Sequence, residues 1–218
     1  PENGSDRQDP LIPPNGPDGL IWDQSEINAD KQGLRTSWVR PDLFGAEGLE
    51  LRAGIDFVKD TADQRLALTD RLWVPPMKYS SVAPYAQLSW EIGPVTLSGG
   101  LRREDGKLKV DSYTTTWYRN RVFVQGGELS YGETLHNIGA VWKIAPEWSV
   151  YVATGEGFGL PNVGIPLRNI NYPGQSVDGI LDLQAIVVNN REIGFNWYGR
   201  DASIGASYYV SKADFGTS

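Results

Sequence analysis

The stretch WSVYVATGEGFGLPNVG (residues 148–164) begins with the alternation of a strand and then runs into a cluster of glycines. A dinucleotide-binding loop needs a strand, a glycine turn and then a helix whose N-terminus receives the pyrophosphate. Leu160 stands where the third glycine of that fingerprint would fall, and Pro161 and Pro166 remove backbone donors that a helix needs. The stretch therefore does not predict a nucleotide site, and its meaning depends on the segments around it.

The composition favours β structure. The 218 residues include 25 Gly, 10 Tyr and 8 Trp but 1 Met, a mixture of turn residues and strand-favouring aromatics. Cysteine is absent, which excludes disulfides, thiol nucleophiles and cysteine-ligated metals. The net charge of −7 arises from dispersed acidic and basic residues, so we expect no nucleic-acid partner. No apolar run is long enough to predict a transmembrane helix.

Segments of period two recur along the chain, and the connections between them alternate between short and long. The short turns are Gly93-Pro94, Ala145-Pro146-Glu147 and Gly199-Arg200-Asp201. The long connections are expected near residues 60–81, 106–134 and 158–186. About eight strands in an antiparallel meander follow, which makes the fold all-β. Short turns on one side and long loops on the other are typical of an outer-membrane β-barrel.

The side-chain pattern along each strand suits a membrane. In residues 49–57 the apolar side chains Leu49, Leu51, Ala53, Ile55 and Phe57 alternate with polar or small ones. This alternation would also suit a soluble antiparallel sheet with one dry face. The tryptophans favour the membrane, because many lie within a few residues of a short turn, where a bilayer interface collects aromatic rings in a girdle. These residues are Trp38, Trp90, Trp142, Trp148 and Trp197.

In this context the opening stretch resembles the signature strand and loop of TonB-dependent outer-membrane receptors. The matching residues are Tyr151, Ala153, Glu156, Gly157, Phe158 and Pro161, while Gly155 replaces the usual serine. APYAQLSWEIGPVTLSGGLRRED (83–105), LHNIGAVWKIAPEWSVYVATGEGF (135–158) and NNREIGFNWYGRDASIGASYYVSKADFG (189–216) are also similar to this family, especially to its siderophore receptors. The resemblance covers roughly residues 30–218 and preserves the order of strands and turns.

The resemblance implies a 22-stranded barrel filled by a plug domain, in the outer membrane of a Gram-negative bacterium. We therefore expect an extracellular loop at residues 1–19 and a partial β-barrel at residues 20–218, with the plug absent from this chain. The implied function is import of a ferric siderophore, energised by the TonB complex acting through the plug. The implied partners are that siderophore and outer-membrane lipid, and no enzymatic activity is expected. No cofactor bound by protein ligands is expected either.

Candidate ligand-binding residues are aromatic rings and arginines in the long loops, because arginine forks bind carboxylate or catecholate oxygens and rings pack against a ligand scaffold. They are Arg71, Trp73, Tyr79, Tyr113, Trp117, Tyr118, Arg119, Arg121 and Arg168. Each of them could instead pack a loop or lie in solvent.

Three further polar residues lie in predicted strands. By alternation Arg102 and Glu104 face inward, toward the lumen or the plug, where an ion pair within the wall explains them equally well. The single histidine, His136, is expected to begin a strand as a polar or lumen-facing residue, because no metal ligands lie at a suitable spacing.

Two other classes of protein remain open on the sequence alone. One is a complete small outer-membrane barrel that acts as an adhesin or structural anchor, and the other is a soluble β-barrel binding protein. The soluble protein would point Leu51, Leu88, Leu97 and Phe195 into a dry core. The nature of the ligand also stays open among siderophore, haem, cobalamin and carbohydrate. Unpaired first and last strands are expected to drive self-association of the isolated piece.

Overall fold

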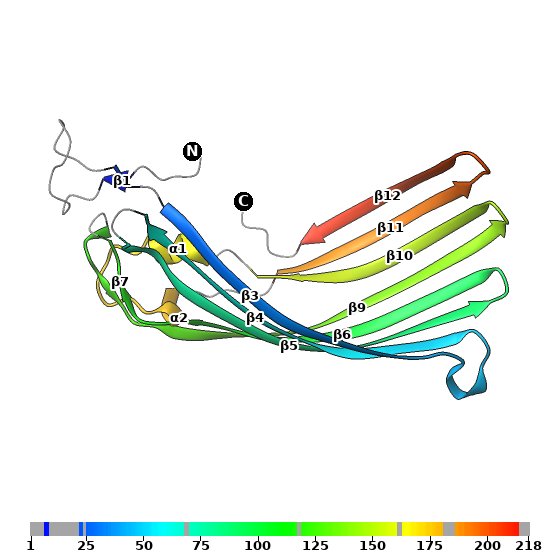
Figure 1. The fold of residues 1–218 in the computed structure, drawn as a ribbon, viewed down its shortest axis with the longest axis horizontal. Coiled ribbons are helices and arrows are strands. Elements are labelled where there is room, and N and C mark those ends of the chain that lie inside the picture. The colour runs from blue at the N-terminus through cyan, green and yellow to red at the C-terminus, as the bar shows by residue number, and fades with distance from the viewer. Residues whose placement is uncertain are drawn as a thin grey trace.

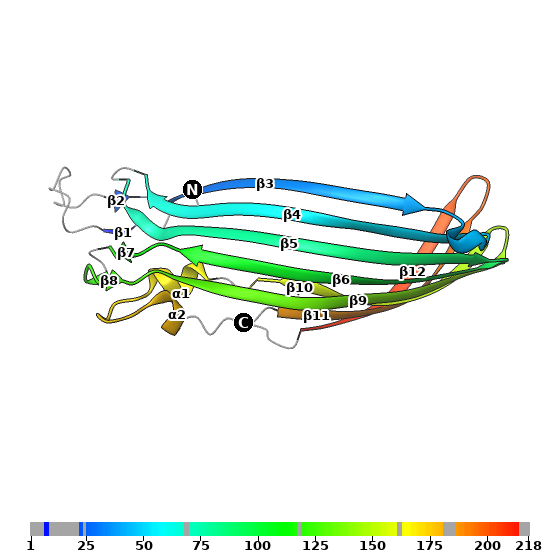
Figure 2. The same ribbon diagram turned by 90° about the horizontal axis from the view of Figure 1, so that it is seen from below.

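A computed structural model describes residues 7–8, 22–23, 25–67, 70–116, 119–160, 163–180 and 186–213. Eight long antiparallel strands form one curved sheet in the order β12-β11-β10-β9-β6-β5-β4-β3 (Figures 1 and 2). The strands are β3 (Ser25–Arg40), β4 (Leu49–Leu66), β5 (Leu72–Ile92), β6 (Val95–Val110), β9 (Gly127–Ala145), β10 (Trp148–Gly159), β11 (Ile186–Tyr198) and β12 (Ser203–Ala213). The predicted all-β antiparallel meander, as part of a larger barrel, is confirmed.

The remaining elements are short. β1 (Arg7–Gln8) pairs with β2 (Trp22–Asp23), and β7 (Tyr113–Thr114) pairs with β8 (Phe123–Val124). The helical turns are η1 (Leu43–Gly45), α1 (Gly164–Arg168) and α2 (Val177–Ile180). Within the described ranges no helix is long and apolar enough to cross a membrane. Apart from Arg7–Gln8, the loop expected at residues 1–19 lies outside the described residues.

The expected loop boundaries at 60–81 and 106–134 are wrong, because strands occupy most of both ranges. β4 continues to Leu66 and β5 begins at Leu72, while β6 continues to Val110 and β9 begins at Gly127. β4 and β5 contain 18 and 21 residues, whereas about 9–11 residues suffice to cross a bilayer. The strands thus extend well past any membrane on the long-loop side. In these extensions the regular alternation of apolar and polar residues that marks a strand in sequence is lost.

The two faces of the sheet differ in chemistry. Cross-strand partners point to the same face, and on β4 one face carries Asp56 while the other carries Leu51 and Phe57. We call the face with Asp56 the inner face and the opposite one the outer face. Leu88, Leu97 and Phe195 have exposed fractions of 44%, 44% and 36%, and together with the half-buried Leu51 they lie on the outer face. None of these four side chains enters a dry core, which contradicts the soluble-barrel alternative.

The tryptophans lie on the outer face near the short turns. Trp38, Trp90, Trp142 and Trp148 are exposed by 43% to 57%. Trp148 stands opposite Trp197 on β11, with ring centroids 6.2 Å apart. Such a row of rings at one end of an apolar band fits an interfacial girdle.

The main hydrophobic core lies at the other end of the sheet, on the inner face. There Leu108 and Val110 of β6 and Tyr131 of β9 pack against the two connections that follow β6 and β10. We call these connections, residues 111–126 and 163–180, the loop cap. The helical turn α1 packs against β5, so the cap covers the long-loop end of the inner face (Figure 1).

Candidate functional site

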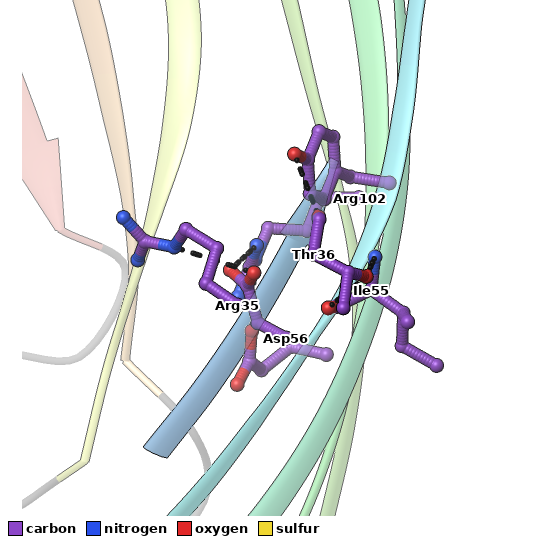
Figure 3. A network of polar contacts seen from close by, with 7 residues as sticks. Arg35, Thr36, Ile55, Asp56 and Arg102 are labelled. Carbon is purple, nitrogen blue, oxygen red and sulfur yellow. Dashed lines mark hydrogen bonds and ion pairs between the residues drawn. The ribbon is translucent and has the colours of Figure 1, made fainter. Parts of the chain in front are cut away.

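A charged network crosses the inner face on three strands. Asp56 of β4 is 4% exposed, and its carboxylate accepts a hydrogen bond of 2.8 Å from Arg102 Nη1 on β6. Arg102 Nε also donates to Glu104 Oε2 at 3.0 Å, and Arg35 Nε on β3 lies 3.3 Å from Asp56 Oδ1. In Figure 3 the two guanidinium groups approach the Asp56 carboxylate from opposite sides. The network therefore links strands that are not adjacent in the sheet.

Gly54, two residues before Asp56 on β4, makes room for the Tyr85 ring. A Cβ on Gly54 would lie 2.7 Å from the Tyr85 hydroxyl and 2.1 Å from the Thr36 carbonyl oxygen. The Tyr85 ring instead crosses β4 and its hydroxyl donates to the Thr36 carbonyl at 3.3 Å. An aromatic ring over a cross-strand glycine fills the gap that the missing side chain leaves.

Arg102 and Glu104 face inward, and the wall ion pair accounts for both. Two carboxylates balance two guanidinium groups, so this part of the wall carries no net charge. The Arg35 side chain is 81% exposed, and it is the part of the network most open to a molecule inside the barrel. The structure thus offers a preorganised charged surface toward the lumen.

Two of the predicted ligand contacts are buried and serve packing. Trp73 is 5% exposed and packs with Leu66 and Val74. Tyr113 is 8% exposed, and its hydroxyl donates to the Leu167 carbonyl oxygen at 2.7 Å. Burial raises the pKa of the Tyr113 phenol, which keeps it a neutral donor. Both rings are thus used for packing, Tyr113 inside the cap and Trp73 in a separate cluster beside the β4–β5 turn, and their contact with a ligand stays a prediction.

Other predicted residues remain at or near the surface of the long-loop end. Tyr79 and Arg168 are half-buried and Arg121 is exposed. Arg119 Nη2 donates to Asn169 Oδ1 at 2.6 Å, which joins the two halves of the loop cap. Arg71 lies in the turn between β4 and β5, where its carbonyl oxygen accepts from the Leu66 amide at 2.8 Å. Trp117 and Tyr118 lie outside the described residues.

The two halves of the cap behave as one packed unit. Gln125 bonds on both sides of Ser176, because its amide donates to the Gln175 carbonyl at 3.1 Å and its carbonyl accepts from the Val177 amide at 2.9 Å. Val124, Leu167 and Val177 are fully buried between these segments. Polar and cationic side chains are thus presented by a surface with its own core, which is a suitable base for ligand recognition.

His136 differs from its expected position. It lies in the middle of β9 and on the outer face, opposite Leu101 of β6, so the expectation of a lumen-facing residue at the start of a strand is wrong. Its Nδ1 lies 2.7 Å from Glu156 Oε2 on β10. Within the described part of the chain no group of three or more His, Asp or Glu side chains could hold a metal ion.

Asp56 and Arg35 are members of the inner network that sequence reasoning missed. Alternation places Asp56 on the same face as Arg102, but only the register of β4, β5 and β6 brings the two side chains together. Asn169 was missed as well, because its role depends on the contact between the two cap segments.

Comparison with known proteins agrees with this architecture. Residues 5–214 match the family described as TonB dependent receptor-like, beta-barrel. A curated relative, the rhizobactin receptor of Rhizobium meliloti (strain 1021), is 23% identical over 236 residues that cover 92% of this chain and 31% of the relative. The chain thus spans about a third of that relative's length.

Solved structures share the fold at low sequence identity. The copper transporter OprC has a TM-score of 0.67 and 16% identity, with 91% of this chain and 32% of OprC covered. The ferric yersiniabactin uptake receptor FyuA from Yersinia pestis has a TM-score of 0.55 and 16% identity, with 88% of this chain and 29% of FyuA covered. The family match spans nearly all of the chain, and the chain belongs to the TonB-dependent receptor-like β-barrel family.

Proposed function

We propose that this chain forms part of the barrel wall of an outer-membrane receptor that imports a ferric siderophore. The observation that carries the proposal is the loop cap, which presents Arg119, Arg121 and Arg168 at the long-loop end of the inner face. Ferric siderophores are usually anionic, and guanidinium groups bind carboxylate and catecholate oxygens in pairs. The relationship to a rhizobactin receptor supports the same class of cargo.

The proposed orientation places the loop cap outside the cell and the short turns in the periplasm. The tryptophan row then marks the inner interface of the outer membrane. The inner face would enclose a plug domain that couples import to the TonB complex. The exposed Arg35 guanidinium and the Arg102–Glu104 pair would face that plug.

Uptake by cells that lack the chromosomal copy tests the proposal. Cells that produce the full-length receptor should accumulate radioactive iron from a ferric siderophore under iron limitation, and uptake should require TonB. Replacing the two cap arginines at positions 121 and 168 by glutamine should weaken siderophore binding by roughly tenfold or more, since charge-assisted contacts are lost. The variant Arg200→Gln, in the turn at the opposite end of the sheet, is the matched control.

Two results would overturn the proposal. One is unchanged uptake of every siderophore class tested when the receptor is deleted. The other is TonB-dependent uptake of haem, cobalamin or a carbohydrate in place of iron chelates. That result would leave the assignment as a TonB-dependent receptor intact and would show that its cargo is not a ferric siderophore.

A further inference from the structure

The outer face carries an apolar groove over β6, β9, β10, β11 and β12. It is lined by outward-pointing side chains, among them Leu97, Ile138, Ala140, Val152, Ile193 and Tyr208. The register places five of these in one row across five strands, with Leu97 opposite Ala140, Ala140 opposite Val152, Val152 opposite Ile193 and Ile193 opposite Tyr208. The small Ala140 side chain lowers the surface between larger neighbours. The row therefore forms a depression bounded by apolar walls.

Two cations close the end of this groove nearer the long loops. Arg191 stands opposite Val210, and Lys212 stands opposite Asn189 one step further along the same face. Both side chains line the groove and both residues are exposed. Within the described residues, no carboxylate lies within ion-pair distance of either one.

The outer-face cations of β5 and β6 do have partners, unlike Arg191 and Lys212. Lys78, Arg103, Lys107 and Lys109 each form an ion pair with a nearby carboxylate. Glu156, beside the groove, is already engaged by His136. Glu192 is one of the lining residues, but its carboxylate accepts a hydrogen bond from the Tyr151 hydroxyl at 2.9 Å. Among the residues that the structure describes, both carboxylates thus have other partners, and neither forms an ion pair with Arg191 or Lys212.

The position of Arg191 along β11 also favours an anionic partner. On β4, five outward positions from Leu49 to Phe57 are apolar, whereas on β11 the apolar run of Trp197, Phe195 and Ile193 ends at Arg191. Arg191 therefore lies near the edge of the hydrocarbon band, where a long basic side chain extends toward the headgroups. A negative charge at that level would belong to a lipid.

We propose that this groove is a binding site for an anionic phosphorylated lipid. One acyl chain lies over Ala140 between Leu97, Val152 and Ile193, and the phosphate sits on the Arg191 guanidinium and the Lys212 ammonium. Asn189 and His136 line the same end of the groove and supply further polar contacts. A neighbouring strand would add beside β12 in the plane of the sheet, so completing a barrel leaves this face open to lipid. The inference rests on the proposed membrane placement.

Native mass spectrometry of the full-length receptor in mild detergent tests this site. The probes are dioleoyl phosphatidylglycerol and dioleoyl phosphatidylcholine, which share chains and differ in net charge. We expect preferential retention of the anionic lipid, weakened about 30-fold in the double variant R191Q/K212Q, since each basic side chain near an anionic surface strengthens binding several-fold. Ala140→Phe, which fills the depression with an apolar side chain, should weaken retention while leaving both cations in place.

The control is Arg200→Gln, which removes an exposed cation at the other end of the same hairpin and should leave lipid retention unchanged. Glycerol phosphate, which carries the charge without chains, should not displace the lipid. Circular dichroism and heat-dependent gel mobility establish that each variant is folded.

The inference is wrong if the wild-type receptor retains both lipids equally, or if R191Q/K212Q retains the anionic lipid as well as wild type. It is also wrong if free glycerol phosphate displaces the lipid, which would mean a site for soluble anions, or if a second receptor copy occupies the groove. These results leave siderophore uptake untouched. Failure of the receptor to fractionate with outer membranes would instead remove the proposed function.

Discussion

Replacing Asp56 by alanine tests whether the inner-face network holds the barrel wall together. The change removes a carboxylate that is 4% exposed and that bonds Arg102 Nη1 at 2.8 Å. A hydrogen bond to a charged partner contributes about 1.5–3 kcal/mol. Removing one member of a fully buried pair costs about 3–5 kcal/mol.

The lower range applies here, for two structural reasons. The Arg102 side chain is 34% exposed and keeps Glu104 at 3.0 Å, so it is not left as an isolated buried charge. The Arg35 contact adds little, because that side chain is 81% exposed and surface ion pairs contribute about 0–1 kcal/mol. We therefore expect Asp56→Ala to lower the free energy of unfolding by about 2 kcal/mol.

The matched control lies on the same strand and the same face. Glu50 pairs with Arg52 at 3.5 Å, with both side chains well exposed, so Glu50→Ala should change the free energy by less than about 0.5 kcal/mol. Urea unfolding of the full-length receptor in lipid vesicles measures the free-energy change for Asp56→Ala and for Glu50→Ala. The double-mutant cycle D56A, R102A and D56A/R102A then gives the coupling energy between Asp56 and Arg102. The reasoning is refuted if Asp56→Ala and Glu50→Ala are equally stable, or if the coupling energy between Asp56 and Arg102 falls below about 0.5 kcal/mol.

Three further predictions concern the cap and the wall. Tyr113→Phe leaves the Leu167 carbonyl without its 2.7 Å hydrogen bond and should destabilise the cap locally by about 1–2 kcal/mol. The loss should be measured as faster amide hydrogen exchange in residues 163–177. Unchanged exchange would mean that this hydrogen bond does not stabilise the cap. The pKa of Asp111 is lowered from 3.8 chiefly by the hydrogen bond from Lys78, so this contact stabilises the β6–β7 corner above the unfolded pKa and is lost as the pH falls through the folded value. Proteolysis of the cap should therefore accelerate in acid, and Lys78→Gln should abolish that difference; a difference that persists in the variant would contradict the assignment. Gly54→Val forces a Cβ against the Thr36 carbonyl and the Tyr85 ring and should strongly reduce the yield of folded, heat-modifiable barrel. Gly99→Ala is the control, because its Cβ would meet one atom at 3.8 Å, and it should leave the yield unchanged. Equal yields of the two variants would show that β3 and β4 adjust to the added side chain.

The sequence by itself determined the strands, the two faces of the sheet and the tryptophan row. These features depend on local physics, since side chains alternate with period two along any strand and glycine and proline mark tight turns. Residues 49–57 and 193–197 show their apolar face without any knowledge of their neighbours. Where β4 and β5 leave the apolar band, the contrast between the faces disappears, and the predicted loop boundaries were wrong there.

Only the tertiary structure decided which side chains meet. The pair between Asp56 and Arg102 joins residues that are far apart in the chain, and a shift of one residue in register would send either side chain to the opposite face. The burial of Tyr113 against Leu167 likewise depends on two long connections packing together. Periodicity describes one strand at a time, whereas the cap, the charged network and the outer groove arise from contacts between strands, which the register and the hydrophobic core determine.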